Sequence, residues 1–298
     1  MAVANPTALT GPLPGGQQGA SVKLHPLLCA EMLVPPEFIA ATGGTVKLIR
    51  AMFGSRENWW RLPIPVYLLE HPGAGLILVD TGFHPSVAVD PKQNLGPVLG
   101  RLYSGAIEMK PEQAVAAQLR ARGIDPGDVA VVIMTHLHVD HASGISEFTK
   151  PTYVLGEGEW EAFHKQGVRK GYVKKHLDVA VDFREVPYGG SATSSYSTFG
   201  RSFDLFGDGS VRLVATPGHA SGHQSVILRL KDREALLAGD AALLLRTLDD
   251  ERRGYAMADE HQWRRSLREI QLYRRENPNA LIIPGHDAET WATLRESY

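Results

Sequence analysis

Short apolar runs rich in β-branched residues alternate along the chain with segments of helical periodicity. Several of these runs are apolar at every position, which is typical of strands buried on both faces. We expect strands at residues 64–69, 76–80, 129–134, 152–156, 211–216, 225–230, 235–239 and 280–285. The alternation of strands and helices predicts layered sheets covered by helices.

Two segments between these runs have the pattern of helices. Pro111 precedes EQAVAAQLRAR and Gly123 follows it, which is typical of a helix with proline in its first turn and glycine at its end. Asp259 can cap a second helix, whose apolar residues should face the core. These residues recur at helical spacing: Trp263, Leu267, Ile270 and Tyr273.

Composition indicates a flexible start followed by one domain. Residues 1–20 are rich in proline, glycine, glutamine and small residues, which predicts a flexible leader. The Gly/Ser-rich segment Tyr188–Gly200 predicts a loop inside a domain, because strands of similar character lie on both sides. We therefore expect a single domain over residues 21–298.

Charge and cysteine content narrow the class of protein. A net charge of −2 offers no basic field for nucleic acid or an anionic membrane, and no apolar run is long enough to cross a bilayer. Cys29 is the single cysteine, which excludes an internal disulfide and a multi-cysteine zinc site. The N-terminus lacks the pattern of a signal peptide, so a cytoplasmic location is expected.

The segment Thr135–Gly144, THLHVDHASG, concentrates histidines directly after an expected strand. His136 and His138 are two positions apart, so both rings can point the same way in an extended chain. Asp140 and His141 follow where the chain turns. Imidazole nitrogens with a carboxylate are ligands that zinc accepts, and the pattern therefore predicts a metal site.

Three further candidate ligands follow other expected strands. His219 and His286 each come after a Pro-Gly pair, and Asp240 ends an apolar run, where an unpaired buried carboxylate would be unfavourable. Each residue alone would be weak support for a metal site. Together with the histidine-rich motif, they predict ligands for a pair of zinc ions.

These residues, in their order along the chain, resemble the dinuclear site of the metallo-β-lactamase superfamily. The sequence LILVDTG, which ends at Gly82, is similar to the superfamily's first motif, and the likeness covers residues 60–290. The resemblance implies an α/β (α+β) fold, the four-layer αββα sandwich. The Asp-Thr-Gly triplet also occurs in aspartic proteases, but a matching second motif is not evident.

The resemblance also implies a role for each candidate. One zinc would be held by His136, His138 and His219, the other by Asp140, His141 and His286, with Asp240 bridging both. Two Zn²⁺ per chain are expected, with other divalent metals as alternatives. Asp80 would accept a hydrogen bond from a ligand imidazole, and His223 would support a ligand rather than bind metal.

Within the superfamily, the chain resembles the N-acyl-homoserine lactonase branch. It shares a long region before the histidine motif, TPGHASGHQS around His219, and a short tail after His286. β-Lactamases usually lack the bridging aspartate, flavodiiron proteins carry glutamate at the position of His138, and glyoxalase II enzymes have a helical segment after the last histidine. RNA-processing members carry basic insertions, which this chain lacks.

The activity implied is hydrolysis of a lactone ring, N-acyl homoserine lactone first, and hence quorum quenching. Water activated by zinc would attack the carbonyl, and Asp140 would pass a proton to the leaving ring oxygen. The alternatives are hydrolysis of another ester, lactone or thioester, as in glyoxalase II, and a non-catalytic metal-binding member of the fold.

The substrate pocket is open to two interpretations. Trp59 and Trp60 could line a pocket for the acyl chain or pack against the partner in a homodimer. Leu243 stands where these lactonases typically carry a tyrosine, and leucine cannot donate a hydrogen bond to the lactone carbonyl. Either zinc alone polarises the carbonyl or another hydroxyl, such as that of Tyr255, reaches in.

Overall fold

The structure, a computed structural model, describes residues 5–41, 44–52 and 54–298 and contains two sheets. In hydrogen-bonded order, the first sheet has eight strands: β1 (Thr7–Ala8), β8 (Asp182–Val186), β7 (Thr152–Gly156), β6 (Val129–Ile133), β4 (Gly75–Val79), β3 (Trp60–His71), β2 (Lys23–Val34) and β5 (Ile107–Glu108). The second has six: β14 (Leu281–Pro284), β13 (Glu234–Gly239), β12 (Gln224–Arg229), β11 (Val211–Ala215), β10 (Phe199–Asp204) and β9 (Ser194–Tyr196).

Helices connect and cover these strands. The α-helices are α1 (Pro36–Ile39), α2 (Gly44–Met52), α3 (Ser86–Val89), α4 (Pro91–Leu102), α5 (Val115–Ala121), α6 (Val139–Ala142), α7 (Glu159–Gln166), α8 (Thr247–Asp250), α9 (Glu260–Glu276) and α10 (Ala288–Thr293). Short 3₁₀ turns lie at Pro111–Gln113, Pro126–Asp128, Ile145–Glu147, Val168–Lys170 and Lys174–Leu177. In the part of the chain that the structure describes, no helix is both long and apolar enough to span a membrane.

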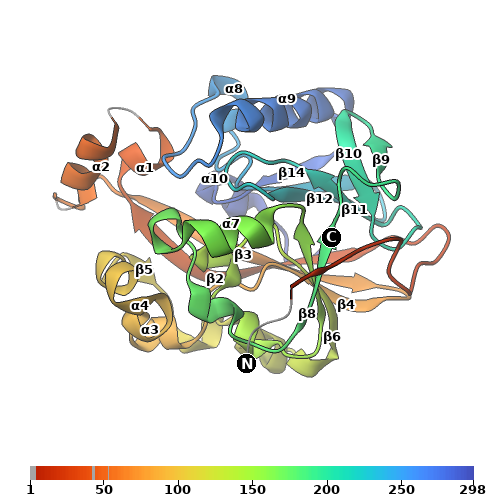
Figure 1. The fold of residues 1–298 in the computed structure, drawn as a ribbon, viewed down its shortest axis with the longest axis horizontal. Coiled ribbons are helices and arrows are strands. Elements are labelled where there is room, and N and C mark those ends of the chain that lie inside the picture. The colour runs from red at the N-terminus through yellow and green to blue at the C-terminus, as the bar shows by residue number, and fades with distance from the viewer. Residues whose placement is uncertain (1–4, 42–43, 53) are drawn as a thin grey trace.

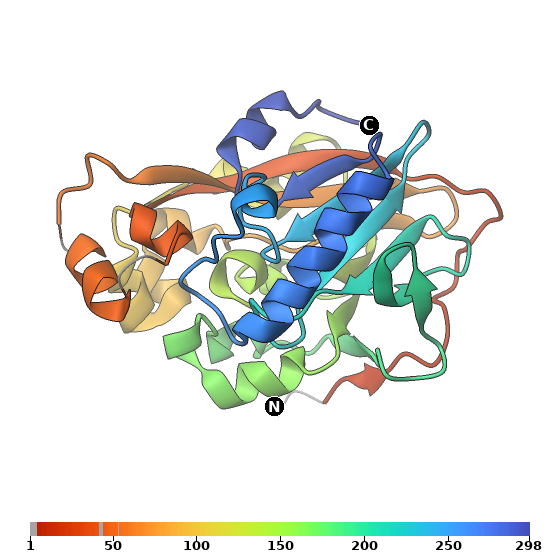
Figure 2. The ribbon, with the colours of Figure 1, turned by 90° about the horizontal axis from the view of Figure 1, so that it is seen from above.

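The layers form an αββα sandwich. Apolar side chains of both sheets, such as Ile133 and Leu213, fill the space between them. The outer face of the eight-stranded sheet packs against α4, α5 and α7. The outer face of the six-stranded sheet packs against α9, which runs diagonally across it (Figures 1 and 2). This arrangement confirms the fold expected from the sequence.

Each expected strand is present, and both expected helices are found with small changes. The first helix is divided into the turn Pro111–Gln113 and α5. The carboxylate of Asp259 caps α9 by accepting the N–H groups of His261 and Gln262 at 2.8 and 3.0 Å. The loop expected at Tyr188–Gly200 is wrong in part, because β9 and the start of β10 lie within it. β9 is the edge strand of its sheet, where small polar residues are tolerated, and it pairs with β10.

Residues 5–20 differ from the flexible leader that composition predicts. β1 pairs with β8 in parallel, and the N–H of Leu13 donates to the carbonyl of Leu205 at 2.7 Å. Leu9 is buried against the core between the sheets. A few apolar side chains and satisfied backbone groups thus order this segment despite its composition. Residues 1–4 lie outside the described residues.

The carboxyl ends of β11, β13 and β14 lie at one edge of the six-stranded sheet, because β12 runs antiparallel to β11 and β13, and β14 pairs in parallel with β13. The carboxyl end of β6 meets them at this edge of the sandwich. Gln224 links the sheets there. Its backbone N–H donates to the carbonyl of Thr135 at 2.9 Å, and its side-chain amide donates to the carbonyl of Met134 at 3.0 Å. The loops that follow these strands are therefore held close together.

We expect Trp263 to contribute both packing and a hydrogen bond to stability. It is 2% exposed, and its indole N–H donates to the carbonyl of Ala241 at 2.9 Å. Trp263→Phe should lower the free energy of unfolding by about 1–3 kcal/mol through the lost hydrogen bond. Trp263→Ala should lower it by about 3–5 kcal/mol.

Urea unfolding measures both changes. The exposed Arg264→Ala on the same helix is the control, and its effect should stay within about 0.5 kcal/mol. Equal losses for the phenylalanine and alanine variants would contradict a separate packing contribution.

Candidate metal centre

Three histidine rings meet around His138 at this edge of the sheets. Nδ1 of His138 lies 3.0 Å from Nε2 of His136 and 2.9 Å from Nε2 of His219. His136 and His138 come from the loop between β6 and α6, whereas His219 follows β11 of the other sheet. The rings are buried, so their nitrogens face one another rather than solvent.

A second group of ligand atoms lies beside the first. Oδ2 of Asp140 is 3.6 Å from Nε2 of both His141 and His286. Asp140 and His141 belong to α6, and His286 follows β14. The ligand atoms of each group lie within 4.8 Å of one another.

Asp240 lies between the two groups. Its Oδ2 is 3.2 Å from Nε2 of His219, and its Oδ1 is 3.1 Å from Nε2 of His286 and 3.5 Å from Nε2 of His141. One carboxylate therefore reaches histidines of both groups. This is the placement that a bridging ligand requires.

Neighbouring groups orient these side chains. Oδ2 of Asp80 accepts from Nδ1 of His141 at 2.8 Å, while its carboxylate also accepts the backbone N–H and hydroxyl of Thr135 at 2.7 and 2.8 Å. The carbonyl of Pro63 accepts from Nδ1 of His286 at 2.9 Å. Each of these bonds engages Nδ1 and turns Nε2 toward the carboxylates.

His223 supports the centre without facing it. Its Nε2 accepts the backbone N–H of Asp240 at 3.0 Å, and its Nδ1 donates to the hydroxyl of Thr216 at 2.9 Å. Both ring nitrogens are thus engaged. The ring fixes the main chain that carries Asp240.

Burial and neighbouring charges shift the pKa values of the clustered side chains in different directions. Burial, followed by the neighbouring imidazoles, holds the pKa of His136 and His138 well below the usual value. Burial also lowers the pKa of His141, but nearby carboxylates led by Asp140 outweigh it and raise that pKa to about 10. Burial acts to raise the pKa of Asp240, yet the surrounding histidines hold it well below its usual range.

The donor set fits metal cations. Neutral imidazoles that face one another can share one proton per pair, so the three nitrogens around His138 cannot all be satisfied among themselves. Nε2 of His141 is also buried without a hydrogen-bond partner. Nitrogen and carboxylate donors that converge in this way suit zinc. Each residue expected as a ligand is brought into this cluster.

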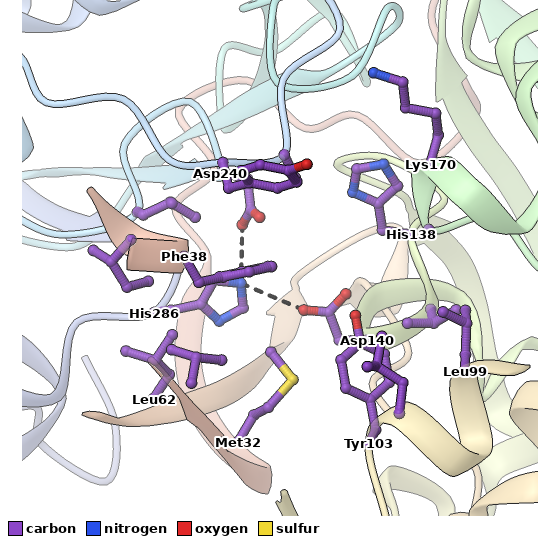
Figure 3. A pocket seen from close by; sticks show the side chains of 18 of the residues that line it. Met32, Phe38, Leu62, Leu99, Tyr103, His138, Asp140, Lys170, Asp240 and His286 are labelled. Atoms are coloured by element: carbon purple, nitrogen blue, oxygen red, sulfur yellow. Dashed lines mark ion pairs between the residues drawn. The ribbon is translucent and has the colours of Figure 1, made fainter. Parts of the chain in front are cut away.

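The cluster opens into a cavity of about 410 Å³. Its wall is largely apolar. Figure 3 shows Met32, Phe38, Leu62 and Leu99 in this wall, on the side that faces the carboxylates and histidines. In the same view Tyr103 lies beside Asp140, and His286 stands between Asp140 and Asp240.

The sequence expectations for this cavity are met in part. Leu243 and Tyr255 line it. Trp59 and Trp60 do not belong to its wall, which corrects the interpretation as acyl-chain contacts. Trp60 starts β3, and its ring stacks on the Arg246 guanidinium at 4.3 Å. The homodimer alternative stays a prediction.

Several residues of the site could not be read from the sequence. Met32 and Phe38 come from β2 and α1, which no hydrophobic period had indicated. Tyr103 follows α4, whose helical pattern is broken at Gly96 with φ +76°. Thr135 stood inside the histidine motif, and its place after a strand and before a ligand was the available signal.

Comparison with known proteins agrees with this geometry. Residues 59–286 match the model of the metallo-beta-lactamase superfamily. The N-acyl homoserine lactonase AttM of Rhizobium radiobacter is 31% identical over 241 residues, which cover 80% of this chain and 87% of AttM. The N-acyl homoserine lactonase AiiA of Bacillus thuringiensis subsp. kurstaki is 31% identical over 242 residues, or 78% and 85% of the two chains.

Solved structures share the fold. An N-acyl homoserine lactone hydrolase with N-hexanoyl-L-homoserine at its catalytic metal centre superposes with a TM-score of 0.72 and 23% identity, covering 92% of this chain and 97% of that one. AidC, a dizinc quorum-quenching lactonase, gives 0.59 and 13%, with coverage of 93% and 90%. By its matched domain and its relatives, the chain belongs to the metallo-beta-lactamase superfamily, in the branch of the N-acyl homoserine lactonases.

Proposed function

We propose that this chain is a dinuclear zinc hydrolase that opens the ring of N-acyl homoserine lactones, and so acts in quorum quenching. The observation that carries the proposal is Asp240, whose carboxylate joins two histidine groups at the base of an apolar cavity. The relatives at 31% identity are N-acyl homoserine lactonases, which supports the same reaction here. Residues 21–298 would act as one hydrolase domain, because both sheets supply ligands.

The proposed ligand assignment follows the two groups. His136, His138 and His219 would hold one ion, Asp140, His141 and His286 the other, and Asp240 would contact both. When bound, two zinc ions would activate water near neutral pH and polarise the lactone carbonyl. Asp80, with its bonds to His141 and Thr135, would keep one ligand ring in place.

The chain's own residues account for the proton transfer. Asp140 lines the cavity and is less buried than Asp240, with side-chain exposures of 13% and 6%. Water adds to the lactone carbonyl carbon, and the bond from that carbon to the ring oxygen breaks. Asp140 would take the proton released by water and deliver it to the ring oxygen, which becomes the homoserine hydroxyl.

The cavity wall suits an acyl-lactone. Apolar side chains from β2, α1 and α4 surround the opening, so an acyl chain can be buried there while the lactone faces the ligand cluster. We assign the hydroxyl of Tyr255 as the hydrogen-bond donor to the lactone carbonyl. Leu243 packs against Gly254, which directly precedes Tyr255 in the chain. Tyr255 therefore lies next to the position where related lactonases carry tyrosine.

Metal content tests the dinuclear assignment. We expect close to two zinc ions per chain by elemental analysis, and loss of lactonase activity with a chelator that zinc restores. The lactonase assay follows acid release from a panel of acyl chain lengths. Fully active protein with one ion or none would contradict the proposal.

Asp240→Ala and Asp80→Asn should differ in severity. The first removes a carboxylate that reaches both histidine groups, so the variant should lose bound metal and most of its activity. The second keeps the ligands but weakens the support of His141, and should reduce metal affinity by about 10–100-fold. Metal content and kcat are measured for both. Equal and mild effects would be incompatible with these roles.

Tyr255→Phe should lower kcat on N-acyl homoserine lactones by about 100- to 1000-fold, as for a lost oxyanion donor, with metal content unchanged. Tyr103→Phe removes another hydroxyl of the cavity and is the matched control, with a smaller effect expected. Leu243→Tyr should then bring no gain. A rise in kcat with Leu243→Tyr, together with wild-type activity of Tyr255→Phe, would show that the donor position is empty.

A further inference from the structure

Glu159 is a carboxylate that the proposed reaction does not use. It is the first residue of α7 and is completely buried, with 0% exposure. Acidic side chains are almost never fully buried unless they are paired. The surrounding residues therefore have to supply hydrogen-bond donors, and the positions of these donors indicate what Glu159 does.

The partners are hydrogen-bond donors on three different segments. Oε1 of Glu159 accepts the backbone N–H of Leu137 at 2.9 Å and the hydroxyl of Tyr172 at 3.1 Å. Oε2 accepts the backbone N–H of Gly222 at 2.9 Å. Each carboxylate oxygen thus holds the main chain of a different loop.

Both loops carry proposed ligands. Leu137 stands between His136 and His138, in the loop after β6. Gly222 belongs to the turn after β11 that presents His219, on the other sheet. A single side chain therefore connects the two segments from which the first ligand group is assembled.

The packing around Glu159 leaves little freedom in this connection. A Cβ on Gly222 would lie 2.3 Å from the backbone nitrogen of Glu159, so the turn sits directly against the start of α7. The ring of Tyr172 lies 4.8 Å from that of His138, centroid to centroid. The same carboxylate thus also fixes a ring that contacts a proposed ligand.

We infer that Glu159 is a positioning residue, whose carboxylate sets the separation of His136 and His138 from His219. The inference rests on the proposed dinuclear centre and adds a residue outside its ligands and their direct supports. Loops that must be brought together by the metal bind it more weakly than loops held in place beforehand. Glu159 would do this for one ligand group and leave the other unaffected.

Glu159→Gln tests the inference, because an amide nitrogen cannot accept a hydrogen bond from a backbone N–H. Either Leu137 or Gly222 then loses its acceptor. We expect zinc affinity at His136, His138 and His219 to fall by about 10–100-fold while the second site keeps its affinity. Competition with a chromophoric chelator gives both affinities, and anomalous diffraction from zinc-loaded crystals shows which position is depleted.

Glu234→Gln is the matched control. Glu234 starts β13, at the opposite end from Asp240, and accepts the hydroxyls of Tyr196 and Tyr273. Thermal unfolding of both metal-free variants measures any general loss of stability. Selective loss in Glu159→Gln alone supports the inference, whereas wild-type affinity, or the same loss in Glu234→Gln, overturns it.

Glu159→Asp keeps the inference testable if the glutamine variant does not fold. The shorter side chain cannot reach both backbone N–H groups, so wild-type zinc affinity in this variant would overturn the inference. The test is separate from the lactonase proposal. If the wild-type chain opens no lactone but zinc affinity still falls selectively in Glu159→Gln, the proposed substrate is wrong and the role of Glu159 is supported.

Discussion

Nδ1 of His138 faces Nε2 of His136 at 3.0 Å and Nε2 of His219 at 2.9 Å, and one ring nitrogen cannot form a linear hydrogen bond with both. In a buried setting such an arrangement is favourable only when cations occupy it, since unsatisfied polar atoms lose their hydration without compensation. Beside this group, Asp80 and Pro63 orient His141 and His286, and His223 holds the main chain of Asp240, which lies between the two groups. The loops at this edge of the sandwich have to hold these nitrogens close together.

Neither sheet could form the centre alone. The eight-stranded sheet supplies the loop after β6, whereas His219, Asp240 and His286 follow strands of the six-stranded sheet. Gln224 and Glu159 cross the boundary near the ligands by bonding to backbone groups on the opposite side. The proposed metal binding would therefore be linked to the packing of the two sheets, because each favours the same relative position of the loops.

The sequence predicts what depends on short-range pattern. Continuous apolar runs reveal the central strands, and the spacing of His136 and His138 indicates a ligand pair because it depends only on neighbouring residues. β2 remains hidden because Pro26 and charged residues interrupt its period, and Gly96 and Pro97 mask α4. The place of Trp60 beside Arg246 and the bonds of Glu159 depend on residues distant in the chain, which no local pattern encodes.

Two histidines of the second proposed ligand group are oriented by different kinds of acceptor. His141 relies on the side chain of Asp80, a residue that also adopts a φ of +63°, whereas His286 relies on the main-chain carbonyl of Pro63. Every amino acid has that carbonyl, so other residues at position 63 would still accept this hydrogen bond as long as the backbone of β3 stays in place. The two ligands thus differ in mutational robustness. Substitutions of Asp80 should therefore disturb the centre far more often than substitutions of Pro63 in β3.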